Sequence, residues 1–175
     1  MRDGFGEDGT IGGHVNPGTT RSVAGFFGWL LLTFAAAALG AIASANAPAF
    51  YAQLDKPSWA PPAGVFGPVW TVLYALMAIS VWLVWRARRL TRPALALFLA
   101  QLAANALWSW LFFAWHRGAF AAVEVLVLLA LIVATAVAFW RSSRVAALLL
   151  VPYLLWVSFA SALTWSVWLR NPGVL

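Results

Sequence analysis

Long apolar segments separated by charged residues make up most of the chain. Five such segments lie near residues 23–43, 68–85, 94–115, 119–140 and 145–169. A helix needs about 20 apolar residues to cross the hydrocarbon of a bilayer. Strands of a membrane β-barrel would alternate apolar and polar residues, whereas runs such as VEVLVLLALIVATAVAF are continuously apolar. The pattern predicts an all-α integral membrane protein, a bundle of five transmembrane helices.

One membrane domain is expected over residues 23–171. Residues 1–22 are polar, rich in glycine and mixed in charge, so they cannot bury enough apolar surface to fold alone and are predicted to be a disordered tail. Residues 172–175 form a short C-terminal tail. The first span could instead be a signal peptide cleaved near the Ala-Ser-Ala at 43–45, although its apolar run exceeds the usual length of about 7 to 15 residues.

Composition agrees with a membrane protein, because 63% of the residues are hydrophobic and 9% are charged, whereas roughly a quarter are charged in a soluble domain. The net charge of +6 comes from arginines at the span ends rather than from a basic stripe with interleaved aromatics, so no nucleic-acid partner is expected. The chain has no cysteine, which excludes disulfides, thiolate nucleophiles and cysteine metal sites.

The distribution of Lys and Arg predicts the topology. Eight of these residues fall in the N-terminal tail and the second and fourth connections, and three fall in the first and third connections and the C-terminus. Basic residues are retained in the cytoplasm. We therefore expect a cytoplasmic N-terminus, with the first loop and the C-terminus outside, in a bacterial cell membrane. The second connection, 86–92, is expected to anchor to anionic headgroups.

The first connection, residues 45–67, contains an unusual segment. From Lys56, the stretch KPSWAPPAGVFGPVWTVLY holds the only lysine and four of the nine prolines of the chain. Loops longer than about 12 to 15 residues usually serve a function, and the prolines stiffen this one. Its aromatic residues, including Trp59, favour folding back onto the helix ends. We interpret the segment as a lid over a ligand pocket.

Polar and aromatic residues share single faces of three predicted helices. In the third span these are Gln101, Asn105, Trp108 and Phe112; in the second, Trp70, Tyr74 and Met77; and in the fifth, Tyr153, Trp156, Ala160 and Leu163. The topology brings them together beneath the first loop. Amides also hold transmembrane helices together, so interhelical contact and pocket lining are both open. A cavity of this kind would suit a flat, largely apolar ligand.

Three further features have open interpretations. Glu124 is the only acidic residue within a span; it could form a polar pocket wall, serve proton coupling or simply reach interfacial water. His116 could ligate haem iron, but a lone interfacial histidine usually does not. Ala96, Ala100 and Ala104 repeat at four-residue spacing, a small-residue row that predicts a homodimer. The sequence shows no constellation of catalytic residues or metal ligands, and no required cofactor is predicted.

Four motifs together resemble the TspO/MBR family, the translocator proteins or tryptophan-rich sensory proteins. These are KPSWAPP, PVWTVLY, QLAANALWSWLFF and VPYLLWVSFASALTW, and the resemblance covers about residues 25–171. It implies a five-helix membrane protein, often dimeric, with a pocket under the first loop. It also implies binding of porphyrins such as protoporphyrin IX and haem and, in animals, of cholesterol and synthetic drugs.

The resemblance carries over to particular residues. Pocket or loop positions of the family are occupied by Trp59, Trp70, Tyr74, Asn105, Trp108, Phe113, Trp156, Ala160 and Leu163. Phe120 stands where some members have tryptophan, and Glu124 where many have aspartate. The chain departs from the animal members at Ala60 and Ala63, which replace a histidine and an arginine. It also departs in the fifth span, where the animal cholesterol-recognition segment requires a tyrosine before its terminal arginine and this chain has Trp165. Lys56 remains as a cation that could meet a porphyrin propionate.

The predicted function is therefore a membrane tetrapyrrole-binding protein that acts as receptor, carrier or sensor. Its partners would be the lipid bilayer, the tetrapyrrole and a second copy of the chain. Two alternatives belong to other classes: an enzyme that degrades porphyrin with light and oxygen, and a proton-coupled exporter of small molecules that uses Glu124.

Overall fold

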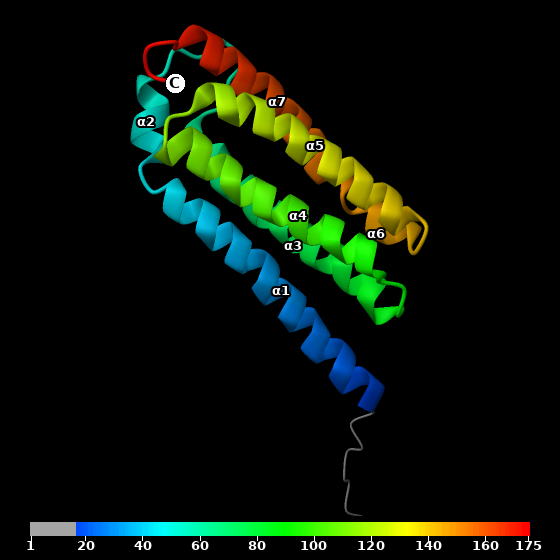
Figure 1. The fold of residues 1–175 in the computed structure, drawn as a ribbon. Coiled ribbons are helices and arrows are strands. Elements are labelled where there is room, and N and C mark those ends of the chain that lie inside the picture. The colour runs from blue at the N-terminus through cyan, green and yellow to red at the C-terminus, as the bar shows by residue number, and fades with distance from the viewer. Residues whose placement is uncertain (1–16) are drawn as a thin grey trace, which may run out of the picture.

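The computed structural model describes residues 17–175, which form an elongated helical bundle (Figure 1). The long helices are α1 (Pro17–Ala43), α3 (Phe66–Arg86), α4 (Arg92–Ser109), α5 (Gly118–Trp140) and α7 (Val151–Arg170). Shorter elements are α2 (Ala47–Gln53), α6 (Arg144–Leu148), a 3-10 turn η1 (Ala63–Val65) and a π-helical segment η2 (Trp110–Ala114). Five helical segments are long and apolar enough to cross a membrane, which confirms the predicted fold class.

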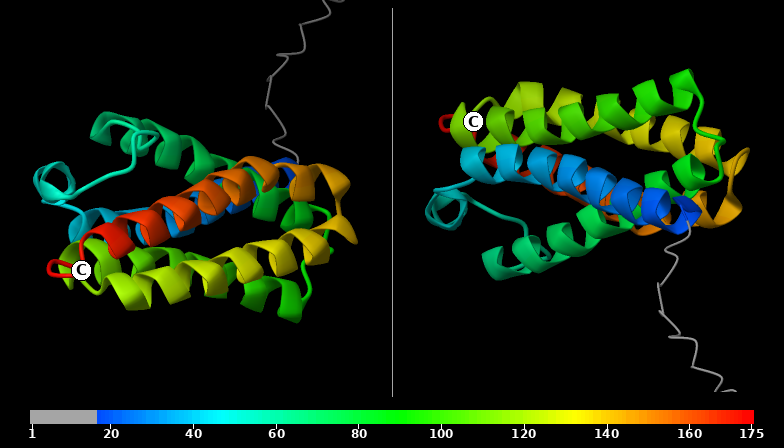
Figure 2. Two further views of the ribbon diagram at one scale, coloured as in Figure 1. Left: turned by 90° about the horizontal axis from the view of Figure 1, so that it is seen from above. Right: turned by 90° about the horizontal axis from the view of Figure 1, so that it is seen from below.

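The helices are arranged in a ring. α3 packs against α1, α1 against α4, α4 against α5 and α5 against α7. The ring closes where α6 packs against α3. The view from below shows α1 between α3 and α4, and the view from above shows α5 alongside α7 (Figure 2). The first two membrane-spanning helices, α1 and α3, are thus adjacent in space. The lid segment lies at one end of the bundle, near the C-terminus (Figure 1).

α5 shows how an almost wholly apolar sequence selects its buried face. Its buried residues include Ala121, Val125, Leu128, Ile132, Thr135 and Phe139, which follow alternating steps of four and three. These steps keep one stripe of the helix facing its neighbours. Residues of the opposite side, such as Val123 and Val127, are exposed and therefore face lipid.

The first helix begins at Pro17, six residues before the predicted start of the span at residue 23. Contacts with α3 hold this extra turn and a half. Trp82 Nε1 donates a hydrogen bond of 2.9 Å to the carbonyl of Ser22, and the Arg21 guanidinium lies over the Trp85 ring, 5.6 Å from its centroid. The predicted tail of residues 1–22 is therefore helical from Pro17, and its first 16 residues lie outside the described part of the chain.

The fifth predicted span, 145–169, consists of two helices, α6 and α7, with a break between them at Leu149 and Leu150. Pro152 has no amide proton to donate to the carbonyl four residues earlier, so the helix cannot continue regularly. The amide of Leu150 bonds to the carbonyl of Ala147 at 3.0 Å. This leaves the Ala146 carbonyl free to accept a hydrogen bond of 2.7 Å from Ser80 Oγ of α3.

The third span ends in a widened turn. In η2 the amide of Trp115 bonds to the carbonyl of Trp110 at 2.8 Å, five residues earlier. Such π-helical turns rotate the following side chains relative to an α-helix and are frequent at functional sites. Here the turn contains Phe112 and Phe113 at the lid end of the bundle.

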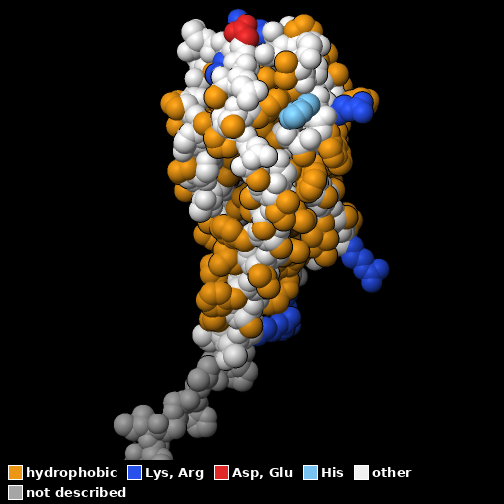
Figure 3. Space-filling view, turned by 90° about the vertical axis from the view of Figure 1, so that its left-hand side faces the viewer, with side chains coloured by type: hydrophobic (Ala, Val, Ile, Leu, Met, Phe, Trp, Pro, Cys, Tyr) orange, Lys and Arg blue, Asp and Glu red, His pale blue; other side chains and the backbone are white. Residues whose placement is uncertain are grey.

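The surface has the character expected of a membrane protein. Hydrophobic side chains cover its middle, and charged side chains lie toward the two ends (Figure 3). Large apolar residues that are more than half exposed include Phe27, Leu31, Ile42, Val72 and Leu155. Their exposure is explained by contact with lipid, so the protein is an integral membrane protein with five spans.

Candidate functional site

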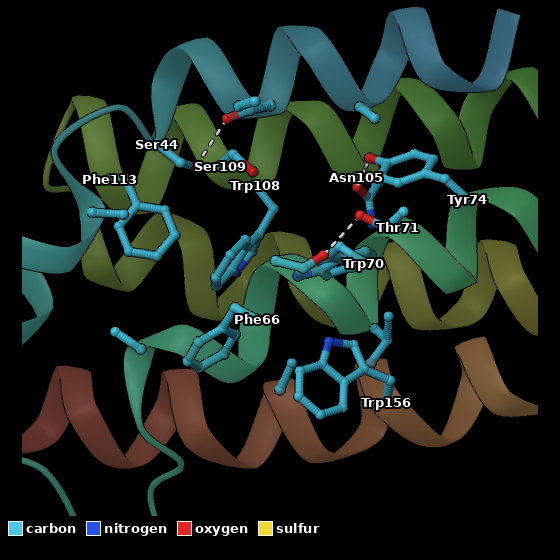
Figure 4. A pocket seen from close by; sticks show the side chains of 18 of the residues that line it. Ser44, Phe66, Trp70, Thr71, Tyr74, Asn105, Trp108, Ser109, Phe113 and Trp156 are labelled. Atoms are coloured by element: carbon cyan, nitrogen blue, oxygen red, sulfur yellow. Dashed lines mark hydrogen bonds between the residues drawn. The ribbon is translucent and has the colours of Figure 1, made fainter. Parts of the chain in front are cut away.

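A cavity of about 680 Å³ lies inside the ring, at the end covered by α2 and η1. Seven residues predicted for the pocket line it: Trp70, Tyr74, Asn105, Trp108, Phe113, Trp156 and Ala160. They come from α3, α4, η2 and α7, and Figure 4 shows their aromatic rings around one space. The volume is within the range of about 300 to 1,000 Å³ typical of small-molecule sites.

The wall formed by α1 was not predicted. Phe34, Ala37, Gly40, Ala41 and Ser44 of this helix line the cavity. The small side chains on this face of α1 leave space for the cavity. Gly40 also permits a close approach of α1 to α4, since an added Cβ would lie 3.2 Å from Ser109 Oγ. The sequence AAAALGAIASA offered the signal, a concentration of small residues late in the first span.

Asn105 connects three helices at the inner end of the cavity. Its Oδ1 accepts a hydrogen bond of 2.5 Å from the Tyr74 hydroxyl, and its Nδ2 donates one of 3.1 Å to the Tyr153 hydroxyl. Tyr74 and Asn105 also line the cavity. The Asn105 amide thus joins helices and also forms part of the cavity wall.

Two tryptophans in the cavity wall have polar atoms without partners. The indole nitrogens of Trp108 and Trp156 are buried and make no hydrogen bond within residues 17–175. Trp108 stacks on Phe112 with ring centroids 5.2 Å apart, while Trp156 meets Phe66 edge-on at 5.9 Å. A buried donor without an acceptor is costly. Among the described residues, both N–H groups are therefore buried donors without an acceptor.

The first connection does cover the cavity. Pro48, Tyr51, Ala63, Gly64 and Phe66 of this segment line the same space as Trp108 and Trp156. The Tyr51 hydroxyl donates a hydrogen bond of 3.0 Å to the Pro61 carbonyl, so it links α2 to the proline turn. Burial raises the pKa of the Tyr51 phenol, which therefore remains a neutral donor.

The lid is fastened to the C-terminal end of α7 by Asn171. Its Oδ1 accepts a hydrogen bond of 2.9 Å from the backbone amide of Asp55, and its Nδ2 donates one of 2.9 Å to the Asp55 carbonyl. The Asp55 carboxylate also lies 3.7 Å from the Arg170 guanidinium, but both side chains are largely exposed. No sequence pattern indicates this role of Asn171, since its partners are backbone atoms 116 residues away.

The two residues expected to cover the ligand, Lys56 and Trp59, do not line the cavity. Lys56 Nζ donates to the carbonyls of Tyr51 at 2.7 Å and Leu54 at 2.8 Å, and so caps the end of α2. Its ammonium has these acceptors in place of a propionate. Trp59 is half exposed and meets Phe159 edge-on at 5.7 Å, on the outer side of α7.

Four other candidates also lie outside the cavity lining. Phe120 is 62% exposed and faces lipid, because it shares no face with the buried stripe of α5. Leu163 is buried beneath the lid, in a cluster that includes Tyr51 and Leu54. Both carboxylate oxygens of Glu124 are buried without a hydrogen-bond partner among the described residues. His116 stacks on Phe50 with ring centroids 4.2 Å apart, on the surface of the lid.

Comparisons with known proteins give the family of this fold and cavity. The sequence profile of the TspO/MBR family matches residues 29–169. The chain belongs to the TspO/MBR family. The matched region includes α3, α4 and α5 in full and nearly all of α7, and it contains every residue that lines the cavity. The resemblance inferred from the four sequence motifs is thus confirmed.

Named members of the TspO/MBR family are similar along most of their length. Protein CrtK of Rhodobacter capsulatus is 41% identical over 141 residues, which cover 79% of this chain and 87% of that protein. The human translocator protein is 40% identical over 129 residues, covering 71% and 76%. The tryptophan-rich sensory protein of Cereibacter sphaeroides is 37% identical over 147 residues, covering 82% and 92%.

Proposed function

We propose that this protein binds a tetrapyrrole such as a porphyrin or haem in the cavity beneath α2 and acts as a membrane receptor, carrier or sensor for it. The observation that supports this best is the aromatic lining of the cavity, which includes Trp70, Trp108 and Trp156. A planar macrocycle offers π-faces to such rings. The sequence resemblance to the TspO/MBR family also implies porphyrins as ligands.

The absence of charge in the cavity lining suggests how such a ligand would be oriented. The residues that line the cavity, all within the described part of the chain, include no charged side chain. Burying an unpaired carboxylate there would be costly. The macrocycle would therefore occupy the cavity, and its propionates would stay toward the membrane surface at the lid end. On this basis the dimethyl ester of protoporphyrin IX should bind at least as tightly as the diacid.

A titration of the purified protein with protoporphyrin IX, followed by quenching of tryptophan fluorescence, tests the proposal. Trp156→Ala should weaken binding roughly tenfold, since loss of an aromatic contact costs about 1 to 2 kcal/mol once its buried area is included. Trp156→Phe keeps an aromatic ring at this position and should therefore weaken binding less than Trp156→Ala.

Trp165→Ala is the matched control, because Trp165 lies on the same helix, is 43% exposed and does not line the cavity. Its titration should superimpose on that of the unmodified protein after correction for the lost fluorophore. Equal affinities for Trp156→Ala and the unmodified protein would show that the porphyrin binds elsewhere. Equal losses in both variants would point to a general effect on the fold.

We also propose that the protein is a homodimer formed through α4. Ala96 and Ala100 are exposed on this helix, and Ala104 is half-buried. Small residues in a row let two helices approach closely in a membrane. Ala100→Leu should shift native mass spectra from dimer to monomer, whereas Ala130→Leu, on the exposed side of α5, should not. A dimer that persists in Ala100→Leu would place the interface on another face.

The topology is proposed from the basic residues, with the N-terminus in the cytoplasm of a bacterial cell and the α2 lid outside. A single cysteine introduced by Ser58→Cys should react with a membrane-impermeant maleimide in intact cells, while one introduced by Ser142→Cys should react only after lysis. The reverse labelling would invert the orientation.

A further inference from the structure

A second hollow, of about 640 Å³, is lined by residues of and beside the α3–α4 and α5–α6 connections. Both connections lie at the end of the bundle opposite the lid (Figure 1). Four arginines line the hollow, Arg86, Arg89, Arg141 and Arg144, together with Ser142 and Ser143. We propose that this hollow binds the phosphodiester group of one anionic glycerophospholipid. The inference does not depend on the tetrapyrrole-binding function, because the two cavities share no lining residue.

The two connections form one continuous surface rather than two separate basic loops. Arg89 Nη1 donates a hydrogen bond of 3.0 Å to the Ser142 carbonyl. In return, Ser142 Oγ donates one of 3.3 Å to the Arg89 carbonyl. The arginines of both segments are thereby held around a shared space, so the basic surface extends beyond residues 86–92, the headgroup anchor predicted from the sequence.

Cation–π contacts hold two of the guanidinium groups without using their hydrogen-bond donors. The Arg86 guanidinium carbon lies 4.7 Å from the centroid of the Trp82 ring, and that of Arg144 lies 5.6 Å from the Trp140 ring. A guanidinium held over an aromatic ring in this way keeps its N–H groups free for bidentate contacts with phosphate oxygens. Phosphate and carboxylate are the groups whose oxygens such a fork matches.

No carboxylate of the described residues neutralises this cluster. Beyond residue 16 the sequence contains two acids, Asp55 and Glu124. Asp55 lies near Arg170, at the lid end. Glu124 is in the second turn of α5 and Arg141 follows its last residue, so the helical rise places them about 25 Å apart, well beyond a Debye length of about 8 Å. Four cations without a counter-charge favour an anion from outside the described chain.

The position of the hollow identifies the source of that anion. The membrane-spanning segments end at Arg86 and Trp140 and begin again at Arg144, so the four guanidinium groups lie at the boundary between hydrocarbon and headgroups. Lipid phosphates occupy this level, and basic pockets between helices there are suited to anionic headgroups. A soluble phosphate would share the chemistry but not this depth.

Native mass spectrometry of the full chain in detergent tests the proposal, with phosphatidylglycerol and phosphatidylcholine of identical acyl chains as the probes. One phosphatidylglycerol per protomer should bind at least about tenfold more tightly than phosphatidylcholine. The variant R86Q/R141Q should lose at least about tenfold of that affinity. The control R88Q/R92Q removes two charges from the same surface but from residues that do not line the hollow, and should lose less than about threefold.

Each result has a defined meaning. Equal losses in the two double variants would overturn the site and leave a general basic surface. Unchanged binding in R86Q/R141Q would also overturn it, provided that circular dichroism shows an intact helical bundle; R86K/R141K, which retains charge but not the guanidinium fork, should give an intermediate loss. Displacement of phosphatidylglycerol by inorganic phosphate would identify a soluble anion site and refute the lipid assignment.

Discussion

Replacement of Asn171 by alanine should loosen the lid. The Asn171 side chain makes two hydrogen bonds of 2.9 Å to the backbone of Asp55, and each is worth about 0.5 to 1.5 kcal/mol. Together they stabilise the closed lid by about 2 kcal/mol, which corresponds to a roughly thirtyfold change in the opening equilibrium. Amide hydrogen exchange in residues 45–67 should accelerate by about this factor, and bound porphyrin should dissociate faster.

Asp55→Asn is the informative comparison. It removes the ion pair with Arg170, whose partners are 3.7 Å apart and 47% and 64% exposed, but it keeps the backbone atoms that Asn171 contacts. Exposed ion pairs contribute about 0 to 1 kcal/mol, so exchange should change by no more than about fivefold. If Asp55→Asn opens the lid as far as Asn171→Ala, the ion pair and not the amide holds it, and the ranking of these interactions is wrong.

Three further variants test other parts of the structure. Asn105→Leu should lower stability by about 1 to 3 kcal/mol in unfolding titrations, because the buried Tyr74 and Tyr153 hydroxyls lose their partner; unchanged stability would mean that water replaces the amide. Gly118→Ala should destabilise by about 1 to 3 kcal/mol, since an added Cβ would lie 2.7 Å from Trp168, whereas Gly28→Ala, with nothing within 4 Å, should not. Glu124→Gln should leave porphyrin affinity within about twofold, as Glu124 does not line the cavity; a larger loss would connect it to the ligand.

The five spans were predictable because each crossing of the membrane requires about 20 consecutive apolar residues, and charged residues separate these segments along the chain. The broken fifth span was visible only as Pro152, and the sequence does not say whether a membrane helix bends or breaks there. α2 has seven residues, too few for a reliable period. Its start is nevertheless marked by Asn46 at the N-cap and a proline in the first turn.

The cavity was predictable to the extent that its residues are aromatic or polar within apolar helices. The α1 wall escaped prediction because its contribution is the small size of residues such as Gly40, which periodicity does not detect in an almost uniformly apolar segment. Lys56 and Asn171 were beyond sequence reasoning for another reason: their partners are backbone carbonyl and amide groups, and every residue offers those. Phe120 lies off the inward face of α5 that Ala121, Val125 and Leu128 define, and the almost uniformly apolar sequence of this helix does not reveal which face that is.

The cavity has packed protein on its inner side, which bears on how a ligand could leave. Between the cavity and the arginine hollow lies a layer of residues that are completely buried, among them Val81, Phe98, Ile132 and Phe139. Ser80 ties α3 to α6 through this layer by its 2.7 Å hydrogen bond to Ala146. A ligand that passed along the bundle axis would have to separate several of these side chains. Exit at the lid end requires only that a short segment move and that its hydrogen bonds break.

Ligand release should therefore respond to the lid and not to this inner layer. Ile132→Val removes one methylene from the layer at a cost of about 0.5 to 1.5 kcal/mol, and porphyrin dissociation measured by stopped-flow fluorescence should remain within about twofold. Asn171→Ala should accelerate the same process about thirtyfold if lid opening limits it. Faster release from Ile132→Val than from Asn171→Ala would mean that the ligand crosses the bundle, and the protein would then have to open at both ends.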